Sequence, residues 1–202
     1  LAQAAGDQTI MTWQANNYYP ADFGGKALAS LNTSISVAVE LVSSGKFKDI
    51  SSAQFTWYLD EKFYKRGVGL KELNFRVSKQ DGNNHSVRVL IEQSGKANEA
   101  AITVPVVKPK VTIDAPYTNK LLTANSRALF QALPYFFNIL SLSDLTFFWD
   151  INGQKEQRDG NNGLAINVTG GEGGNSILIS ASAQNRNELL EFANEKLRMN
   201  IY

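Results

Sequence analysis

The sequence predicts an all-β chain made of two tandem β-sandwich domains. One short pattern occurs twice, as Phe-Thr-Trp-Tyr-Leu-Asp at residues 55–60 and as Phe-Phe-Trp-Asp-Ile-Asn-Gly at residues 147–153. The central tryptophans, Trp57 and Trp149, are separated by about the length of one small sandwich domain, roughly 100 residues. Turn-forming residues also recur about every ten residues, with period-two alternation between them, which is typical of sandwiches.

The first domain is predicted over residues 9–107. A first strand is expected at residues 10–14, followed by a loop at residues 16–25, which are rich in Asn, Gly and Tyr. The later strands alternate apolar and polar residues, as strands with one buried face do. Their apolar rows are Ile35, Val37, Val39 and Leu41; Phe55, Trp57 and Leu59; Leu73, Phe75 and Val77; Val87, Val89 and Ile91; and Ile102, Val104 and Val106. Because Pro105 cannot donate a ladder hydrogen bond, the last of these strands is predicted at a sheet edge.

Residues 108–110, Lys-Pro-Lys, are predicted to be a short linker, stiffened by proline, that restricts the angle between the domains. The second domain is predicted over residues 111–202, with a bend at Pro134 and a Gly-rich turn at residues 169–175. Residues 188–196 fit either a short helix or a hairpin connection. The apolar rows of this domain are Phe147, Trp149 and Ile151; Leu164, Ile166 and Val168; Ile177, Ile179, Ala181 and Ala183; and Leu197, Met199 and Ile201.

Composition excludes several classes of function. The 202 residues carry 20 basic and 19 acidic side chains spread along the chain, so no basic block predicts a nucleic-acid partner. The absence of cysteine excludes disulfides and thiolate chemistry. No apolar run reaches the roughly 18 residues that span a bilayer, so a membrane anchor would lie outside residues 1–202. Residues 1–4, Leu-Ala-Gln-Ala, have the small-x-small form that precedes a signal-peptidase cut, or are an Ala-rich start. This start favours an exported protein.

No residue pattern predicts catalysis, and the chain is expected to be no enzyme, with no catalytic, cofactor-binding or metal-binding residues. His85 is the only histidine, and it is interpreted as a solvated residue beside a turn. Carboxylates such as Asp60 and Glu61 could support glycoside hydrolysis, but nothing around them in sequence predicts a raised pKa, so a solvated role is favoured. The Asp-Gly-Asn-Asn strings at residues 81–84 and 159–162 lack calcium-loop spacing and are interpreted as plain turns.

Aromatic residues are the best candidates for binding. Tyr18, Tyr19 and Tyr58 are candidate platforms for stacking on a sugar ring or for anchoring a protein partner. Trp57 and Trp149 are instead predicted to fill the cores of the two sandwiches. Residues 135–137, Tyr-Phe-Phe, are expected either in the second core or between the domains.

The repeated Trp motifs, each followed by a Gly-Leu strand at residues 69–70 and 163–164, resemble bacterial immunoglobulin-like and PKD-like tandem surface repeats. The patterns at residues 13–28 and 134–137 are more narrowly similar to exported proteins of candidate-phyla bacteria. The resemblance implies two immunoglobulin-like sandwiches in a non-enzymatic structural or adhesive module at the cell surface, with a protein or glycan partner. The alternatives are a carbohydrate-binding module and an accessory domain of a larger secreted hydrolase.

Overall fold

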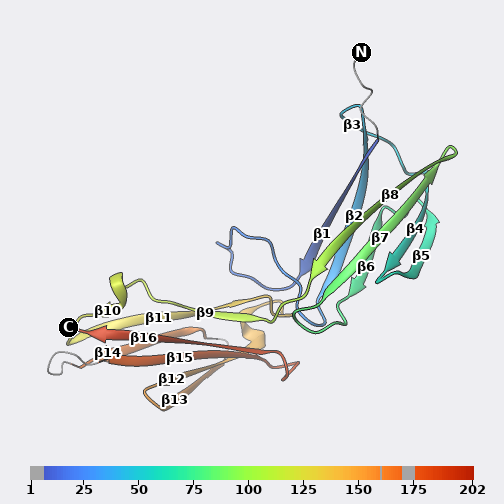
Figure 1. Cartoon of the computed structure of the whole chain (residues 1–202). Helices are drawn as coiled ribbons and strands as arrows, with labels where there is room; N and C mark the ends of the chain where they lie inside the picture. Colours follow the sequence, from blue (N-terminus) through green and yellow to red (C-terminus); the bar gives the residue numbers. More distant parts are fainter. Residues whose placement is uncertain (1–6, 160, 170–175) are drawn as a thin grey trace. The chain divides into compact units, whose positions relative to one another are not determined.

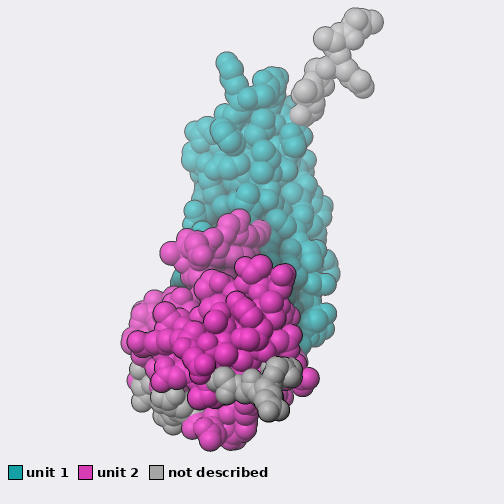
Figure 2. All heavy atoms as spheres, turned by 90° about the vertical axis from the view of Figure 1, so that its left-hand side faces the viewer, with its two compact units in different colours: residues 1–16, 27–107 teal, residues 17–26, 108–202 magenta. Residues whose placement is uncertain are grey.

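The computed structural model describes residues 7–159, 161–169 and 176–202. The regular elements among these residues are β-strands and two short 3-10 turns, η1 (Thr118–Lys120) and η2 (Leu142–Asp144). The all-β prediction is therefore confirmed. The chain divides into two compact units: unit 1 is residues 1–16 and 27–107, and unit 2 is residues 17–26 and 108–202 (Figure 2). None of the described residues belongs to a helix with the length and hydropathy of a membrane span.

Unit 1 contains two antiparallel sheets (Figure 1). In the first sheet β2 is central, with β1 on one side and β6 and β3 on the other; these strands are β1 (Gln8–Asn16), β2 (Ser34–Ser43), β3 (Lys46–Phe47) and β6 (Glu72–Arg76). The second sheet has the order β5-β4-β7-β8, with β4 (Gln54–Leu59), β5 (Lys62–Val68), β7 (Asn84–Gln93) and β8 (Lys96–Pro105). Pro105 thus ends an edge strand, as the sequence predicts.

Unit 2 repeats this arrangement. Its three-stranded sheet has the order β14-β11-β9, from β9 (Lys110–Asp114), β11 (Ser126–Tyr135) and β14 (Gly163–Val168). Its five-stranded sheet has the order β10-β16-β15-β12-β13, from β10 (Leu121–Leu122), β12 (Leu145–Ile151), β13 (Gln154–Asp159), β15 (Ser176–Asn185) and β16 (Phe192–Ile201). Apart from the small strands β3 and β10, the two units have the same strand order. Each is an immunoglobulin-like sandwich, with the first, second and fifth strands in one sheet.

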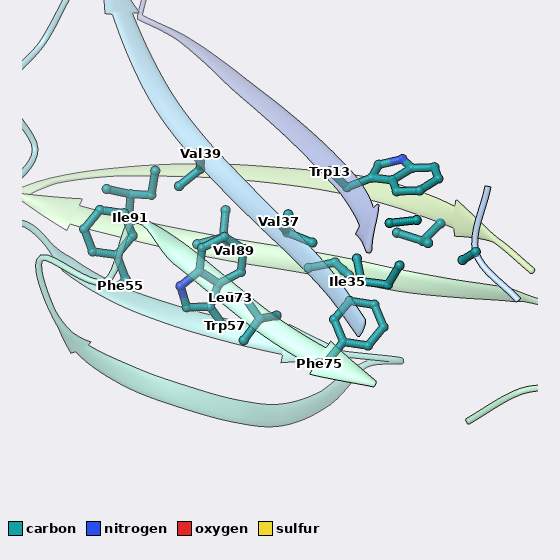
Figure 3. Close-up of a cluster of buried hydrophobic side chains, with 14 of the residues drawn as sticks. Trp13, Ile35, Val37, Val39, Phe55, Trp57, Leu73, Phe75, Val89 and Ile91 are labelled. Carbon is teal, nitrogen blue, oxygen red and sulfur yellow. The ribbon is translucent and has the colours of Figure 1, made fainter. Parts of the chain in front are cut away.

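The repeated motif lies on equivalent strands, β4 and β12. Trp57 and Trp149 are both fully buried, each in the hydrophobic core of its own unit. Figure 3 shows Trp57 in the core of unit 1 with Leu73 and Val89, which come from strands of opposite sheets. The apolar rows thus face inward because alternate side chains of a strand point to the same face.

Two segments differ from the sequence predictions. Pro134 does not bend the chain: it stays in β11 opposite Val111, and the turn comes at Phe136, which has a positive φ of 64°. The helix alternative for residues 188–196 is wrong, because β16 starts at Phe192 and pairs with β15 along its length. There the cross-strand pairing decides the structure rather than local helix propensity. The start at residues 1–4 and most of the turn at residues 169–175 lie outside the described residues.

Residues 17–26, which the sequence analysis places in the first domain, belong to unit 2. The Tyr18 N–H donates to Phe137 O (2.8 Å) and the Phe136 N–H donates to Tyr18 O (2.6 Å). The Phe23 ring lies edge-on to Tyr135 and Phe136, with centroids 5.3 and 5.9 Å away. Phe137 itself is buried in the core of unit 2. The chain therefore passes between the units three times, after residues 16, 26 and 107, and the predicted linker at residues 108–110 is part of unit 2.

Candidate functional site

The three candidate stacking tyrosines do not form one platform, because Tyr58 belongs to unit 1 whereas Tyr18 and Tyr19 belong to unit 2. Tyr58 is half-buried, with the Arg88 guanidinium 4.0 Å from its ring centroid and the Phe63 ring edge-on at 6.4 Å. Tyr18 is half-buried, and burial raises the pKa of its hydroxyl. Tyr19 is exposed and lies 5.8 Å from the Phe23 ring. Of the three, Tyr19 is the most exposed.

His85 is buried, so its interpretation as a solvated residue is wrong. Its Nδ1 lies 2.8 Å from Asp60 Oδ2, and the Ser78 N–H donates to its Nε2 at 3.3 Å. The Phe75 ring packs against the imidazole with centroids 5.3 Å apart. Because Nε2 accepts a hydrogen bond, the ring proton belongs on Nδ1, where it is donated to Asp60. His85 is the first inward residue of the row that continues through Val87 and Val89, a signal already present in the sequence.

Asp60, for which a solvated role was expected, is half-buried and lies at the centre of this network. Its carboxylate accepts hydrogen bonds from Lys79 Nζ (2.7 Å), the Ser86 N–H (3.0 Å) and His85. Burial by itself would raise the pKa of Asp60, but these hydrogen bonds outweigh it and lower the pKa below its usual value. The neighbouring Glu61 carboxylate is exposed, as expected.

The hairpin between β4 and β5 aims Asp60 at His85. Asp60 and Glu61 form its two-residue turn with positive φ values of 51° and 63°. The equivalent hairpin of unit 2 uses Asn152 and Gly153, the pair that such turns favour. The turn of unit 1 is thus less favourable in backbone conformation, but its Asp60 supplies a carboxylate that joins the turn to β7. Since Nε2 of His85 is occupied by a backbone N–H, this pair is not arranged as a catalytic base.

Two loops of unit 2 present exposed leucines. The loop between β11 and β12 carries Leu140, a residue that is 94% exposed, and the loop between β15 and β16 carries Leu190, which is 87% exposed. Leu189 and Phe192, beside Leu190, are also exposed. We call these four residues the leucine tip. The sequence analysis missed it because the leucines at 189 and 190 also fit one face of a helix.

A buried carboxylate, Glu191, fixes the base of both loops. Its Oε1 accepts hydrogen bonds from the backbone N–H (2.8 Å) and the side-chain amide (2.6 Å) of Asn138, and its Oε2 accepts one from Asn185 Nδ2 (2.6 Å). Burial raises the pKa of Glu191, although the hydrogen bonds from Asn185 and Asn138 oppose the shift. The Arg186 N–H also donates to Asp144 O at 3.0 Å, which joins the loops at a second point. The leucine tip therefore stands on a preorganised base.

A second candidate surface is an open groove of about 430 Å³ on the five-stranded sheet of unit 2. Phe148 is its partly exposed aromatic ring. The groove also contains hydroxyl, amide and charged side chains from four strands, namely Asp150, Lys155, Ser180, Ser182, Asn194 and Lys196. Within the described residues, no three His, Asp or Glu side chains are grouped as metal ligands would be.

No protein-family model and no curated protein matches the chain. Among solved structures it is similar to the fibronectin(III)-like modules of CbhA from Clostridium thermocellum, with 14% identity over 94% of each chain and a TM-score of 0.35. It is also similar to the four N-terminal Ig domains of Dscam1, with 16% identity over 87% of this chain and 42% of that chain and a TM-score of 0.36. A third similar structure is the glucan-utilization protein SGBP-B of Bacteroides ovatus in complex with a mixed-linkage heptasaccharide, with 15% identity over 94% of this chain and 47% of that chain and a TM-score of 0.26. The narrower resemblance to PKD-like repeats and to candidate-phyla proteins stays a prediction.

Proposed function

We propose that the protein is a non-enzymatic structural and adhesive module of an exported bacterial surface protein, and that unit 2 binds a protein partner through the leucine tip. The observation that carries the proposal is the near-complete exposure of Leu140 and Leu190 on loops joined by the buried Glu191. Exposed apolar clusters with a polar rim are typical of protein-binding sites.

The fixed base of the loops matters for affinity. A loop that is ordered before binding loses less conformational entropy when its partner docks. Asn138 and Asn185 hold both oxygens of the Glu191 carboxylate, so the leucines project from a defined position. A partner that fits this surface has an apolar pocket for Leu140 and Leu190.

The test is crosslinking on intact source cells. The purified wild-type chain, a Leu140→Asp/Leu190→Asp variant and a Leu129→Asp control are added separately, crosslinked mildly and digested, and the neighbours are identified by mass spectrometry. Leu129 is an exposed leucine of the same unit that lies on β11, away from both loops in sequence. Wild type and control should capture the same surface proteins, and the double variant should lose them while retaining its circular dichroism spectrum.

Two results would overturn the proposal. If the double variant captures the same neighbours as wild type, the leucine tip is not the binding site. If protease treatment of intact cells releases no peptide of the native chain, while a lysed control is fully digested, the surface location is wrong.

A second candidate function is carbohydrate binding, either as a separate module or as an accessory domain of a larger secreted hydrolase. The groove around Phe148 supports it, because an exposed aromatic ring bordered by hydroxyl and amide groups suits a sugar ring. This groove replaces Tyr58 as the candidate platform, since Arg88 covers one face of the Tyr58 ring. Titration with mixed-linkage glucan oligosaccharides should shift the amide resonances of β12 and β15, and Phe148→Ala should abolish the shifts. Equal shifts in the variant would remove this candidate.

A further inference from the structure

The edge strand β5 of unit 1 has an unusual surface. Figure 1 shows β5 beside β4 at the end of its sheet, and no further strand of the described chain pairs with its other side. Six of its seven residues are exposed; only Gly67 is half-buried. Three of the exposed residues are large and apolar: Phe63, Tyr64 and Val68, with Phe63 at 63%. The strand therefore presents apolar side chains and a free backbone edge together.

The same strand is strongly basic. Lys62, Lys65 and Arg66 lie within it and it contains no acidic residue. The nearby carboxylates already have cationic partners: Glu92 lies 3.4 Å from Arg66, and Glu61 lies 3.4 Å from Arg88. Within the described part of the chain, Lys62 and Lys65 form no ion pair. The surplus positive charge of β5 is thus available to a partner.

Unit 2 supplies an internal comparison. Its strand β13 occupies the equivalent edge, and its sequence, Gln-Lys-Glu-Gln-Arg-Asp, has no apolar residue and balanced charge. The fold therefore does not require an aromatic, basic strand at this position. Tyr64 has a partner within the unit, since its hydroxyl donates to Asn74 O at 3.3 Å. Lysines and a β-bulge, which here shifts the β4–β5 register between Trp57 and Tyr58, can protect an edge strand from pairing with other chains, but protection gives no reason to expose Phe63 and Val68 on the same strand.

We infer that β5 is a docking edge for an extended acidic peptide segment of another protein, which adds a strand to the sheet. In this mode backbone hydrogen bonds supply affinity and alternate side chains supply specificity. Lys62 and Lys65 would contact carboxylates of the segment, and Phe63 and Val68 would contact its apolar side chains. Single-stranded nucleic acid also binds aromatic, basic surfaces, but it makes no use of an unpaired strand edge. This site is on unit 1 and is independent of the leucine tip.

The experiment follows the amide resonances of the full chain by NMR during titration with a soluble peptide of alternating Glu and Val. Shifts are expected in β5 and β4, with affinity that falls as salt is raised. A peptide of alternating Lys and Val should not bind, and a Glu-Val peptide with a central proline should bind about tenfold more weakly, because proline removes a ladder donor.

Two variants make the test specific. Lys62→Glu/Lys65→Glu should lose the Glu-Val peptide and gain the Lys-Val peptide. Lys110→Glu, which changes an exposed lysine on β9 of unit 2, should bind as wild type does. The inference is overturned if the shifts lie outside β5 and β4, if the proline peptide binds as well as its parent, or if oligothymidine binds the same residues more tightly than the peptide. The Leu140→Asp/Leu190→Asp variant should still bind the peptide. The docking edge on β5 and the leucine tip are therefore tested independently, and either proposal can be overturned without the other.

Discussion

His85 Nδ1 lies 2.8 Å from Asp60 Oδ2, and this contact joins the tight turn after β4 to the start of β7. The backbone N–H of Asp60 also donates to Ser86 O at 2.8 Å. Lys79 closes the network by donating to both Asp60 Oδ1 and Asn84 O. A polar cluster that is fully hydrogen-bonded can fix one conformation of a sandwich end, which an apolar cluster does less specifically.

Replacing His85 should destabilise unit 1. His85→Ala leaves the Asp60 carboxylate without one donor and the Ser78 N–H without its acceptor, and it opens space beside Phe75. We expect the free energy of unfolding to fall by about 1–3 kcal/mol, measured by denaturant titration. His85→Gln, which offers one donor and one acceptor, should recover part of the loss. An unchanged midpoint in His85→Ala would mean that the network contributes nothing to stability.

Asp60 should make unit 1 more stable at neutral than at acidic pH. Its pKa is lowered in the folded protein, so the contribution of the carboxylate is fully present above the unfolded pKa and is lost as the pH falls through the folded value. Asp60→Asn should therefore be less stable than wild type at neutral pH, and the difference should shrink in acid. Denaturant titrations at a series of pH values measure the stability difference between wild type and Asp60→Asn. A difference that grows in acid would contradict a lowered pKa for Asp60 in the folded protein.

Glu191 should act in the opposite direction in unit 2. Its pKa is raised in the folded protein, so the folded state holds the proton more tightly, and stability is lost as the pH rises from the unfolded pKa through the folded one. Glu191→Gln keeps a hydrogen-bonding side chain but cannot ionise. The stability of this variant relative to wild type should therefore increase with pH. Hydrogen exchange of the β15 amides in the two proteins measures this relative stability. A relative stability independent of pH would show that Glu191 does not titrate differently in the two states.

The sequence predicts the sandwiches well because period-two alternation is a local signal. The rows through Val37, Trp57 and Val89 all face the core as expected. His85 belongs to such a row too, but it was interpreted as solvated because it is polar and lies beside a turn. Its partner Asp60 is 25 residues away in the sequence. The leucine tip depends on Glu191 reaching Asn138, which is 53 residues away. No local pattern specifies contacts between residues so far apart in the sequence. Residues 17–26 join unit 2 through contacts of the same kind, so the sequence does not predict which unit they belong to.

Phe23 should stabilise unit 2 although it precedes most of unit 1 in the chain. Its ring packs edge-on against Tyr135 and Phe136, and each such aromatic pair contributes about 0.5–1.5 kcal/mol beyond its buried area. Phe23→Ala should therefore accelerate hydrogen exchange in β11 and leave β4 and β7 unchanged. Gly25→Ala offers a second variant, because a Cβ there would lie 2.5 Å from Phe23 Cζ and displace the ring. Faster exchange in β4 instead of β11 would contradict the assignment of residues 17–26.

Replacing Trp57 or Trp149 by alanine should lower the free energy of unfolding by similar amounts, whereas replacement by phenylalanine should affect the two positions differently. Both side chains are fully buried on equivalent strands, so Trp→Ala should cost about 3–5 kcal/mol in either unit. The Trp57 indole N–H donates to Leu70 O at 2.8 Å, whereas Trp149 Nε1 has no hydrogen-bond partner among the described residues. Trp57→Phe thus removes the donor to a backbone carbonyl, and Trp149→Phe removes only a buried, unpaired N–H. Unfolding free energies should show Trp57→Phe to be the costlier change by about 1–3 kcal/mol, the penalty for an unsatisfied polar group. Equal costs would mean that the Trp57 hydrogen bond adds nothing, and an unchanged melting temperature in Trp149→Ala would contradict the equivalence of β4 and β12.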